Sequence, residues 1–243
     1  MKQLYRQQIG QELIKIVDRI YIINLEFRRD RLLEISDQLA LVGLAIGTGH
    51  IRRFDAVRPA EAGPWPSVGA RGCYMSHLNI LREAAAGGVQ SIAIIEDDLD
   101  WSSAFLGTSP QDITLMGQGG WQYLHAGTNS GASPVRTRYL SPDQKLLQTH
   151  FVAFRGDAIA RAVAYLEAMA ARPPGSSDGG PMHVDGAYNW FRSDNPDITA
   201  ALCDPAIGHQ RSSGTDISSK RWFDSTPLVR DFTRLARKAK RFM

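Results

Sequence analysis

Three consecutive carboxylates, Glu96, Asp97 and Asp98, directly follow a short apolar run that begins at Ser91. Such a run predicts a strand buried on both faces, and because a core does not bury unpaired carboxylates, we expect the acids at the strand's carboxyl end near solvent. Ligands bind there in open α/β sheets, and hard oxygen ligands suit Mg²⁺ or Mn²⁺ carrying a phosphate-containing substrate. The stretch predicts a metal and diphosphate site, although a solvated loop or helix N-cap would have the same acidic residues.

Two other segments carry residues that can contact a phosphate. In the first, residues 19–31, an apolar strand runs into a loop with three arginines, and in the second, residues 72–78, glycine and cysteine open an expected helix. Arg28 and Arg31 are multi-donor cations suited to phosphate, and backbone N–H groups at a helix N-terminus favour an anion. The alternative is that the arginines pair with neighbouring acids and that His77 is structural.

The three segments together resemble glycosyltransferase family 25. The resemblance lies in Asn24-Leu25-x-x-Arg28-x-Asp30-Arg31, then Gly72-Cys73-x-x-Ser76-His77-Leu78, then apolar-Glu96-Asp97-Asp98, in the family's order and at about its spacing. That family includes bacterial lipopolysaccharide and lipooligosaccharide galactosyltransferases and is related to collagen galactosyltransferases. A looser resemblance extends from about Ile20 to Ile217. The chain departs from the family after Phe54-Asp55-Ala56, where Arg58-Pro59 stands in place of the usual glycine.

The resemblance implies a reaction and a set of site residues. It implies transfer of a hexose, galactose or glucose, from a UDP-sugar to a hydroxyl of a glycan or glycolipid such as lipopolysaccharide, with inversion and with Mn²⁺ or Mg²⁺. We expect metal ligands at Glu96, Asp98 and His209, catalytic carboxylates at Asp97 and Asp185 (Asp185 as general base), and donor contacts from Asn24, Arg28, Arg31, Gly72, Ser76 and His77. The alternatives are a non-catalytic nucleotide-sugar-binding relative and a metal-dependent phosphohydrolase.

Alternating strand and helix patterns must position these residues, and they predict an α/β class. We expect strands at 20–25, 51–57, 91–96, 121–126, 151–154 and 198–207, helices at 31–44, 74–86 and 157–171, and irregular structure at 101–118. The resemblance implies a single GT-A-type, Rossmann-like domain with a mixed, mostly parallel sheet flanked by helices. We place this domain at residues 19–225, after a helical extension (1–18) and before a basic amphipathic helix (226–243).

Composition limits the other possibilities. With 243 residues and 43% hydrophobic residues the chain can bury a sizeable core. The two cysteines, Cys73 and Cys203, lie far apart, which indicates neither a disulfide framework nor a zinc site. No stretch is an apolar run long enough to span a bilayer, and residues 1–18 lack a secretory signal pattern. We therefore expect a cytoplasmic protein without a nucleic-acid partner.

The net charge of +3 is unevenly distributed, because residues 228–243 hold six basic residues and one acidic residue. A basic amphipathic helix there can bind the anionic inner face of the cytoplasmic membrane, or it can be a solvated terminal helix.

Overall fold

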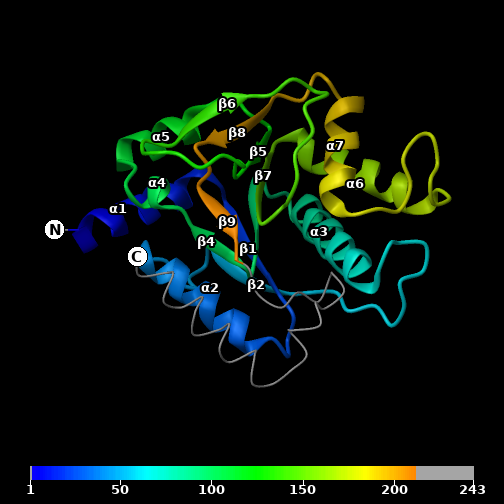
Figure 1. Ribbon diagram of the computed structural model, residues 1–243, viewed down its shortest axis with the longest axis horizontal. Coiled ribbons are helices and arrows are strands. Elements are labelled where there is room, and N and C mark those ends of the chain that lie inside the picture. The colour runs from blue at the N-terminus through cyan, green and yellow to red at the C-terminus, as the bar shows by residue number, and fades with distance from the viewer. Residues whose placement is uncertain (1, 212–243) are drawn as a thin grey trace. The chain divides into compact units, whose positions relative to one another are not determined.

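The computed structural model describes residues 2–211, which are built around a mixed β-sheet (Figure 1). Its strands are β1 (Arg19–Asn24), β2 (Ile51–Asp55), β3 (Ser91–Glu96), β5 (Tyr123–His125), β6 (Arg136–Tyr139), β7 (Phe151–Arg155) and β8 (Ala200–Asp204). Within the described range these seven strands lie in the order β2-β1-β3-β7-β5-β8-β6. Only β7 and β6 run against the other five, which confirms the predicted mixed, mostly parallel sheet.

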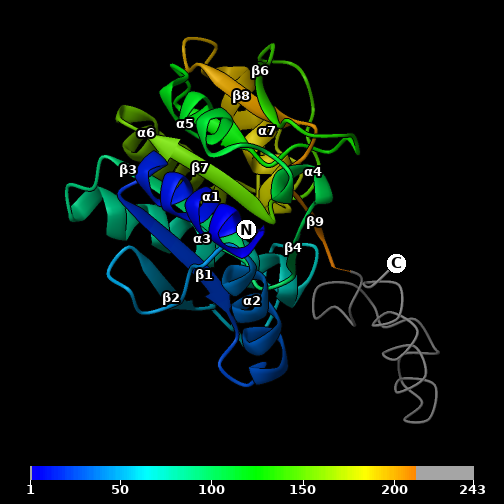
Figure 2. The same ribbon diagram turned by 90° about the vertical axis from the view of Figure 1, so that its left-hand side faces the viewer.

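Helices cover both faces of this sheet (Figures 1 and 2). One face is covered by α1 (Lys2–Ile16), α2 (Arg29–Leu41), α4 (Ser103–Leu106) and α5 (Pro110–Gln118), and the other by α3 (Val68–Ala86), α6 (Asp157–Ala171) and α7 (Val184–Asp194). The arrangement follows from strands that are apolar on both sides. In β1, Ile20 and Ile22 pack into the core under α1, whereas Tyr21 and Ile23 pack into the core under α3. The charged and amide side chains of β1 and β3 therefore lie at the strand ends.

A second, two-stranded sheet begins directly after the acidic residues. Strand β4 (Leu99–Trp101) pairs antiparallel with β9 (Gly208–Gln210), so Leu99 lies opposite Gln210. Trp101 fixes this small sheet against α2, because its indole N–H donates to the Gln38 carbonyl at 2.9 Å. The pairing brings the end of the described chain back to the acidic residues.

Three local predictions differ from the structure. Residues 101–118 are not irregular but contain α4 and α5, whose N-caps Ser102 and Ser109 accept hydrogen bonds from the backbone of Phe105 and Asp112. The helix expected from residue 74 begins earlier, at Val68. The predicted strand at 198–207 is divided between β8 and β9.

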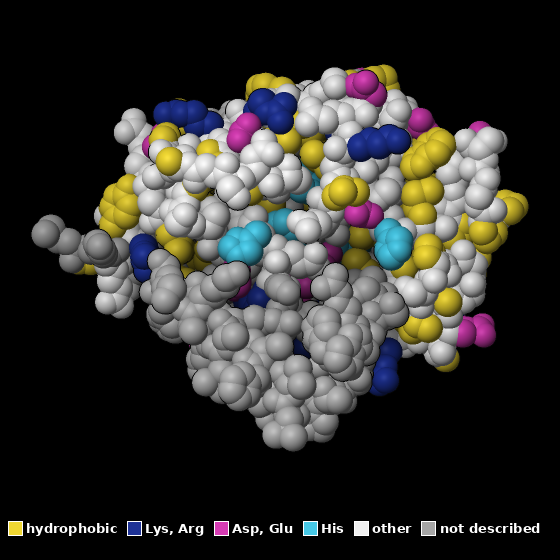
Figure 3. Space-filling model, in the orientation of Figure 1, with side chains coloured by type: hydrophobic (Ala, Val, Ile, Leu, Met, Phe, Trp, Pro, Cys, Tyr) yellow, Lys and Arg dark blue, Asp and Glu magenta, His cyan; other side chains and the backbone are white. Residues whose placement is uncertain are grey.

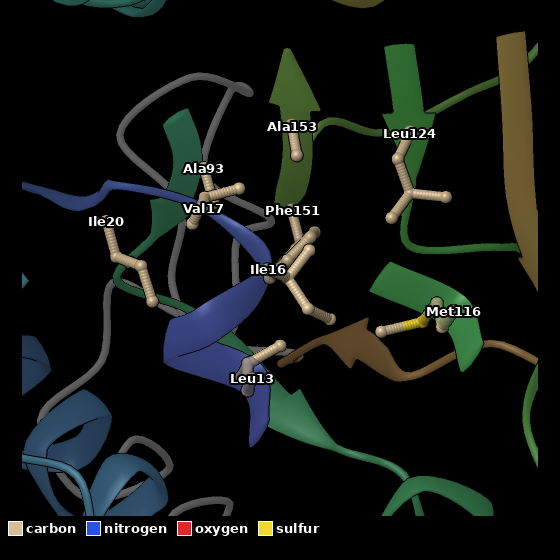
Figure 4. Close-up of a pocket in the computed structure, with 9 residues that line it drawn as sticks. All are labelled: Leu13, Ile16, Val17, Ile20, Ala93, Met116, Leu124, Phe151 and Ala153. Atoms are coloured by element: carbon tan, nitrogen blue, oxygen red, sulfur yellow. The ribbon is translucent and has the colours of Figure 1, made fainter. Parts of the chain in front are cut away.

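Helix α1 belongs to the core of the described part of the chain. Ile9, Leu13 and Ile16 are buried in the same cluster as β1 and β3, while Leu4 is exposed. Between α1 and the sheet lies an apolar cavity of about 10 Å³, shown in Figure 4. Its lining side chains are all apolar: Leu13, Ile16, Val17, Ile20, Ala93, Met116, Leu124, Phe151 and Ala153. Because it offers no polar partner, this cavity is not a site for a nucleotide sugar.

The helix predicted at 226–243, and the final part of the domain predicted at 19–225, lie outside the described residues. Among the helices of residues 2–211, none combines the length and the apolar character needed to cross a membrane.

Candidate functional site

The acidic turn lies at the carboxyl end of β3, as predicted, but it is not open to solvent. Asp97 is 6% exposed and Asp98 is 5% exposed, and the side chain of Glu96 is 12% exposed. The expectation of acids near solvent was therefore wrong. Asp97 and Asp98 are instead buried and Glu96 is partly buried. Each has its own set of partners, which gives the three acids different chemistry.

Asp97 joins β1 and α2 to the end of β3. Its two carboxylate oxygens accept hydrogen bonds from Asn24 Nδ2 at 2.8 Å and from Arg31 Nη1 at 3.1 Å. Burial raises the pKa of Asp97, and the charge of Arg31 opposes that rise. Both Asn24 and Arg31, which we expected to contact the donor, are buried against this carboxylate. Asp97, predicted as catalytic, thus anchors the residues around it.

Glu96 is the centre of a hydrogen-bonded cluster beneath α3. Its Oε1 accepts from Thr149 Oγ1 at 2.7 Å and lies 3.4 Å from His77 Nε2 and 3.7 Å from Cys73 Sγ. The other ring nitrogen of His77 lies 3.1 Å from the Tyr188 hydroxyl. Although burial acts to raise it, the hydrogen bonds and charges of this cluster, those of His77 first, hold the pKa of Glu96 below its usual value.

Asp98 has one buried oxygen without a hydrogen-bond partner. Its Oδ2 accepts a hydrogen bond from Gln210 Nε2 at 3.0 Å, whereas its Oδ1 is buried without a hydrogen-bond partner. Arg31 Nη1 lies 3.9 Å from Oδ2. Burial, and then the neighbouring charge of Glu96, raise the pKa of Asp98 to about 7. A buried acceptor of this kind fits a cation ligand.

The predicted acceptor-side acid, Asp185, lies in the first turn of α7 and is half-buried. Its Oδ2 accepts from the Gln148 backbone N–H at 3.2 Å.

Burial raises the pKa of the Cys73 thiol, and the charges of Glu96, Asp98 and Asp185 raise it further. The acidic turn and α7 therefore place negative charge around one thiol.

Other predicted donor contacts have structural partners. Ser76 donates to the Gly72 carbonyl at 2.7 Å and accepts from the Val57 backbone N–H at 2.8 Å, which fixes the loop after β2 to α3. Arg28 binds Asp30 through two nitrogens, at 3.0 and 3.1 Å.

Gly72 does not open α3, contrary to our expectation. The helix N-cap is Ser67, which accepts from the Ala70 N–H at 3.0 Å, so Gly72 and His77 both lie beyond the first turn. The helix N-terminus on which that expectation relied therefore lies at Ser67 and not at Gly72, while the donor contact of Gly72 stays a prediction. Gly72 has another role, since a Cβ atom there would lie 2.6 Å from the Val57 carbonyl oxygen.

The predicted metal ligands are not gathered as one set. His209 is exposed in β9, next to the Gln210 that binds Asp98. In the part of the chain that the structure describes, the three potential ligands whose atoms all lie within 4.8 Å of one another are Cys73, His77 and Glu96. The ligand assignment to Glu96, Asp98 and His209 stays a prediction. Figure 3 shows histidine and acidic side chains gathered in the middle of one face.

Sequence reasoning missed Thr149, Tyr188 and Gln210. Thr149 comes just before β7, and because β7 is antiparallel to β3 with Phe151 opposite Ile95, its start meets the end of β3. The polar pair Thr149-His150 in front of an apolar strand was a usable signal. Arg211, at the end of the described chain, pairs with Asp100 at 2.6 Å and with Glu34 at 2.7 Å.

No protein-family profile matches the chain, and no curated protein matches it. A crystal structure of a glycosyltransferase involved in the glycosylation of the major capsid of PBCV-1 is similar, with a TM-score of 0.44 and 11% sequence identity. The similarity covers 76% of this chain and 81% of that chain. Similarity at this level supports no statement about activity, which has to rest on the motifs and the site.

Proposed function

We propose that this protein is a GT-A-type glycosyltransferase that moves a hexose, galactose or glucose, from a UDP-sugar to a hydroxyl of a glycan or glycolipid such as lipopolysaccharide. One observation carries the proposal: the three segments that resemble family 25 meet at one edge of the sheet. Asn24 and Arg31 of the first segment bind Asp97 of the third, and His77 of the second faces Glu96 of the third. Inversion follows from the resemblance alone.

On the donor side, Asp98 with Glu96 and His209 would hold Mn²⁺ or Mg²⁺. The unpartnered, buried Oδ1 of Asp98 fits this assignment, because hard cations prefer carboxylate oxygens. When bound, the cation would offset the charge that develops on the UDP diphosphate. Arg28 follows β1 at the same edge, in the loop where we expect the nucleotide, and pairs with Asp30.

On the acceptor side, we assign the general base to Asp185. An acceptor hydroxyl is a poor nucleophile at neutral pH, and a carboxylate that takes its proton typically contributes about 10²–10⁴-fold to the rate. Asp185 is half-buried in the first turn of α7. The hydrogen bond from Gln148 N–H orients it.

The first test is binding. We would measure the melting temperature of the folded full chain with a panel of nucleotide sugars, each with and without Mn²⁺. A ligand at 100 times its Kd stabilises the folded state by about 2.7 kcal/mol. Stabilisation by one UDP-sugar that increases with Mn²⁺ is the expected result and identifies the donor. No shift with any donor would contradict the proposal.

The second test separates transfer from its alternatives. Asp98→Asn should abolish Mn²⁺-dependent transfer while the chain stays folded, and Asp143→Asn, at an exposed position, should leave it unchanged. Wild-type activity of Asp98→Asn in excess EDTA would contradict the metal assignment. Release of free UMP or phosphate without an acceptor would instead identify a phosphohydrolase.

A further inference from the structure

Cys73, His77 and Glu96 form a cluster that the proposed transfer does not use as a set. Cys73 and His77 lie four residues apart on α3 and so face the same direction, toward the end of β3. His77 Nε2 and Cys73 Sγ lie 3.4 and 3.7 Å from Glu96 Oε1, and all three ligand atoms lie within 4.8 Å of one another. One nitrogen, one sulfur and one oxygen thus converge from two elements.

We propose that Cys73, His77 and Glu96 bind a transition-metal ion of the Zn²⁺ type, at a site distinct in chemistry from the Mg²⁺ or Mn²⁺ site of the proposed transferase. A thiolate and an imidazole select Zn²⁺ over hard cations. Three protein ligands leave a fourth tetrahedral position open. The sequence indicated no zinc site because the two cysteines are far apart, but this site uses only one of them.

The surroundings of the cluster match those of protein-bound metals. A metal-ligating histidine usually donates its other N–H to a fixed partner, and His77 Nδ1 lies 3.1 Å from the buried Tyr188 hydroxyl. A ligating carboxylate is usually held by a hydrogen bond, and Thr149 donates to Glu96 at 2.7 Å. Two of the three proposed ligands, His77 and Glu96, are therefore oriented by a neighbour.

Binding exchanges a proton for the metal, because the thiolate and not the thiol is the metal ligand. The Cys73 S–H bond breaks, a sulfur–metal bond forms, and the thiol proton passes to solvent.

The site can be tested independently of the proposed transferase activity. Cys73 is half-buried, whereas His77 is fully buried. The bound ion would link α3 to the end of β3 and would share Glu96 with the donor-side cation site. The experiment below uses no nucleotide. Its outcome therefore does not depend on whether the chain binds a UDP-sugar.

Cobalt is the probe, because Co²⁺ replaces Zn²⁺ and gives a thiolate-to-cobalt absorption band. We expect this band to appear when Co²⁺ is added to the metal-free full chain. Added Zn²⁺ should remove the band, whereas excess Mg²⁺ should not. Cys73→Ser should lose the band, whereas Cys203→Ala, at a buried cysteine outside the cluster, should keep it. Tyr188→Phe and Thr149→Val should each weaken Co²⁺ affinity by about 10–100-fold.

Proton release gives a second measurement on the unmodified chain, which does not depend on any variant folding. Calorimetric titration with Zn²⁺ in buffers of different ionisation enthalpy should show that protons are released on binding. Absence of a thiolate band in the wild-type chain, or a band that persists in folded Cys73→Ser, would overturn the proposal. Binding without proton release would overturn it as well.

Discussion

At the residue scale, two neighbouring aspartates differ because their oxygens have different partners. Both oxygens of Asp97 accept hydrogen bonds, from Asn24 and Arg31, whereas Asp98 keeps one buried oxygen without a partner. A fully occupied carboxylate holds its neighbours in place, while an unoccupied one is available to a ligand. We therefore infer that Asp97 is a positioning residue and that Asp98 is the cation ligand of the pair.

The first prediction concerns Asp97→Asn. The amide can accept only one of the two hydrogen bonds, so its NH₂ group must face a donor, and we expect a loss of about 2 kcal/mol in the free energy of unfolding. The matched control is Asp197→Asn. The Asp197 carboxylate also accepts two hydrogen bonds, both from Arg161, but its side chain is 68% exposed. This substitution should therefore change the free energy of unfolding by less than about 1 kcal/mol. Urea denaturation measures both. Unchanged stability of Asp97→Asn with lost transfer would instead support the catalytic role predicted from sequence.

The second prediction follows from the raised pKa of Asp98, about 7 in the folded chain against about 3.9 for an unperturbed aspartate. The folded state binds the extra proton between these values, so stability falls as pH rises from about 4 to 7. From pH 6 to 8 the metal-free chain should lose about 1 kcal/mol through this group. Denaturation curves at both pH values test it, and Asp98→Asn should remove that part of the pH dependence. Stability that rises with pH equally in both proteins would contradict the assignment.

At the element scale, the reversed direction of β7 explains most of what the sequence did not reveal. The strand at 151–154 was predicted, but a strand followed by a helix gave no indication that it runs antiparallel to β3. That reversal puts Thr149 against Glu96. Strand positions follow from local apolar patterns, whereas pairing direction depends on the whole sheet. The same limit applies to Gln210, which reaches Asp98 through the β4–β9 pairing.

The third prediction tests how α3 is positioned. In Gly72→Ala the new Cβ atom would lie 2.6 Å from the Val57 carbonyl oxygen, a backbone atom, so the helix or the loop after β2 must shift. We expect a loss of about 1–3 kcal/mol, the range for overpacking. Gly120→Ala is the control, because a Cβ there meets nothing within 4 Å. Thermal denaturation compares them. A stable Gly72→Ala that no longer binds a UDP-sugar would favour the original prediction of a donor contact.

At the scale of the whole molecule, described here for residues 2–211, the α/β class and the place of the acidic residues were predictable from sequence. Apolar runs such as 91–95 require cover on both faces, and the helical patterns supply it. The partners of each carboxylate were not predictable, because Glu96, Asp97 and Asp98 each bind residues from different elements. The acids can be buried because these partners bind them. A rule that uses only the local sequence does not include the partners, and it therefore placed the acids in solvent.

The fourth prediction concerns the boundary placed at residue 18. Leu13 is 2% exposed in the core that α1 shares with β1 and β3, whereas Leu4 on the same helix is 67% exposed. Leu13→Ala should lower the free energy of unfolding by about 2–5 kcal/mol, and Leu4→Ala should have little effect. The Arg155 guanidinium also depends on α1, because Nη2 donates to the Ile16 carbonyl at 2.7 Å and would lose this acceptor in a chain that starts at residue 19. We therefore expect that truncated chain to lose its cooperative thermal transition. If it instead melts at the temperature of the full chain, residues 1–18 are a separate extension, as the sequence first indicated, and α1 does not stabilise the sheet that holds the site.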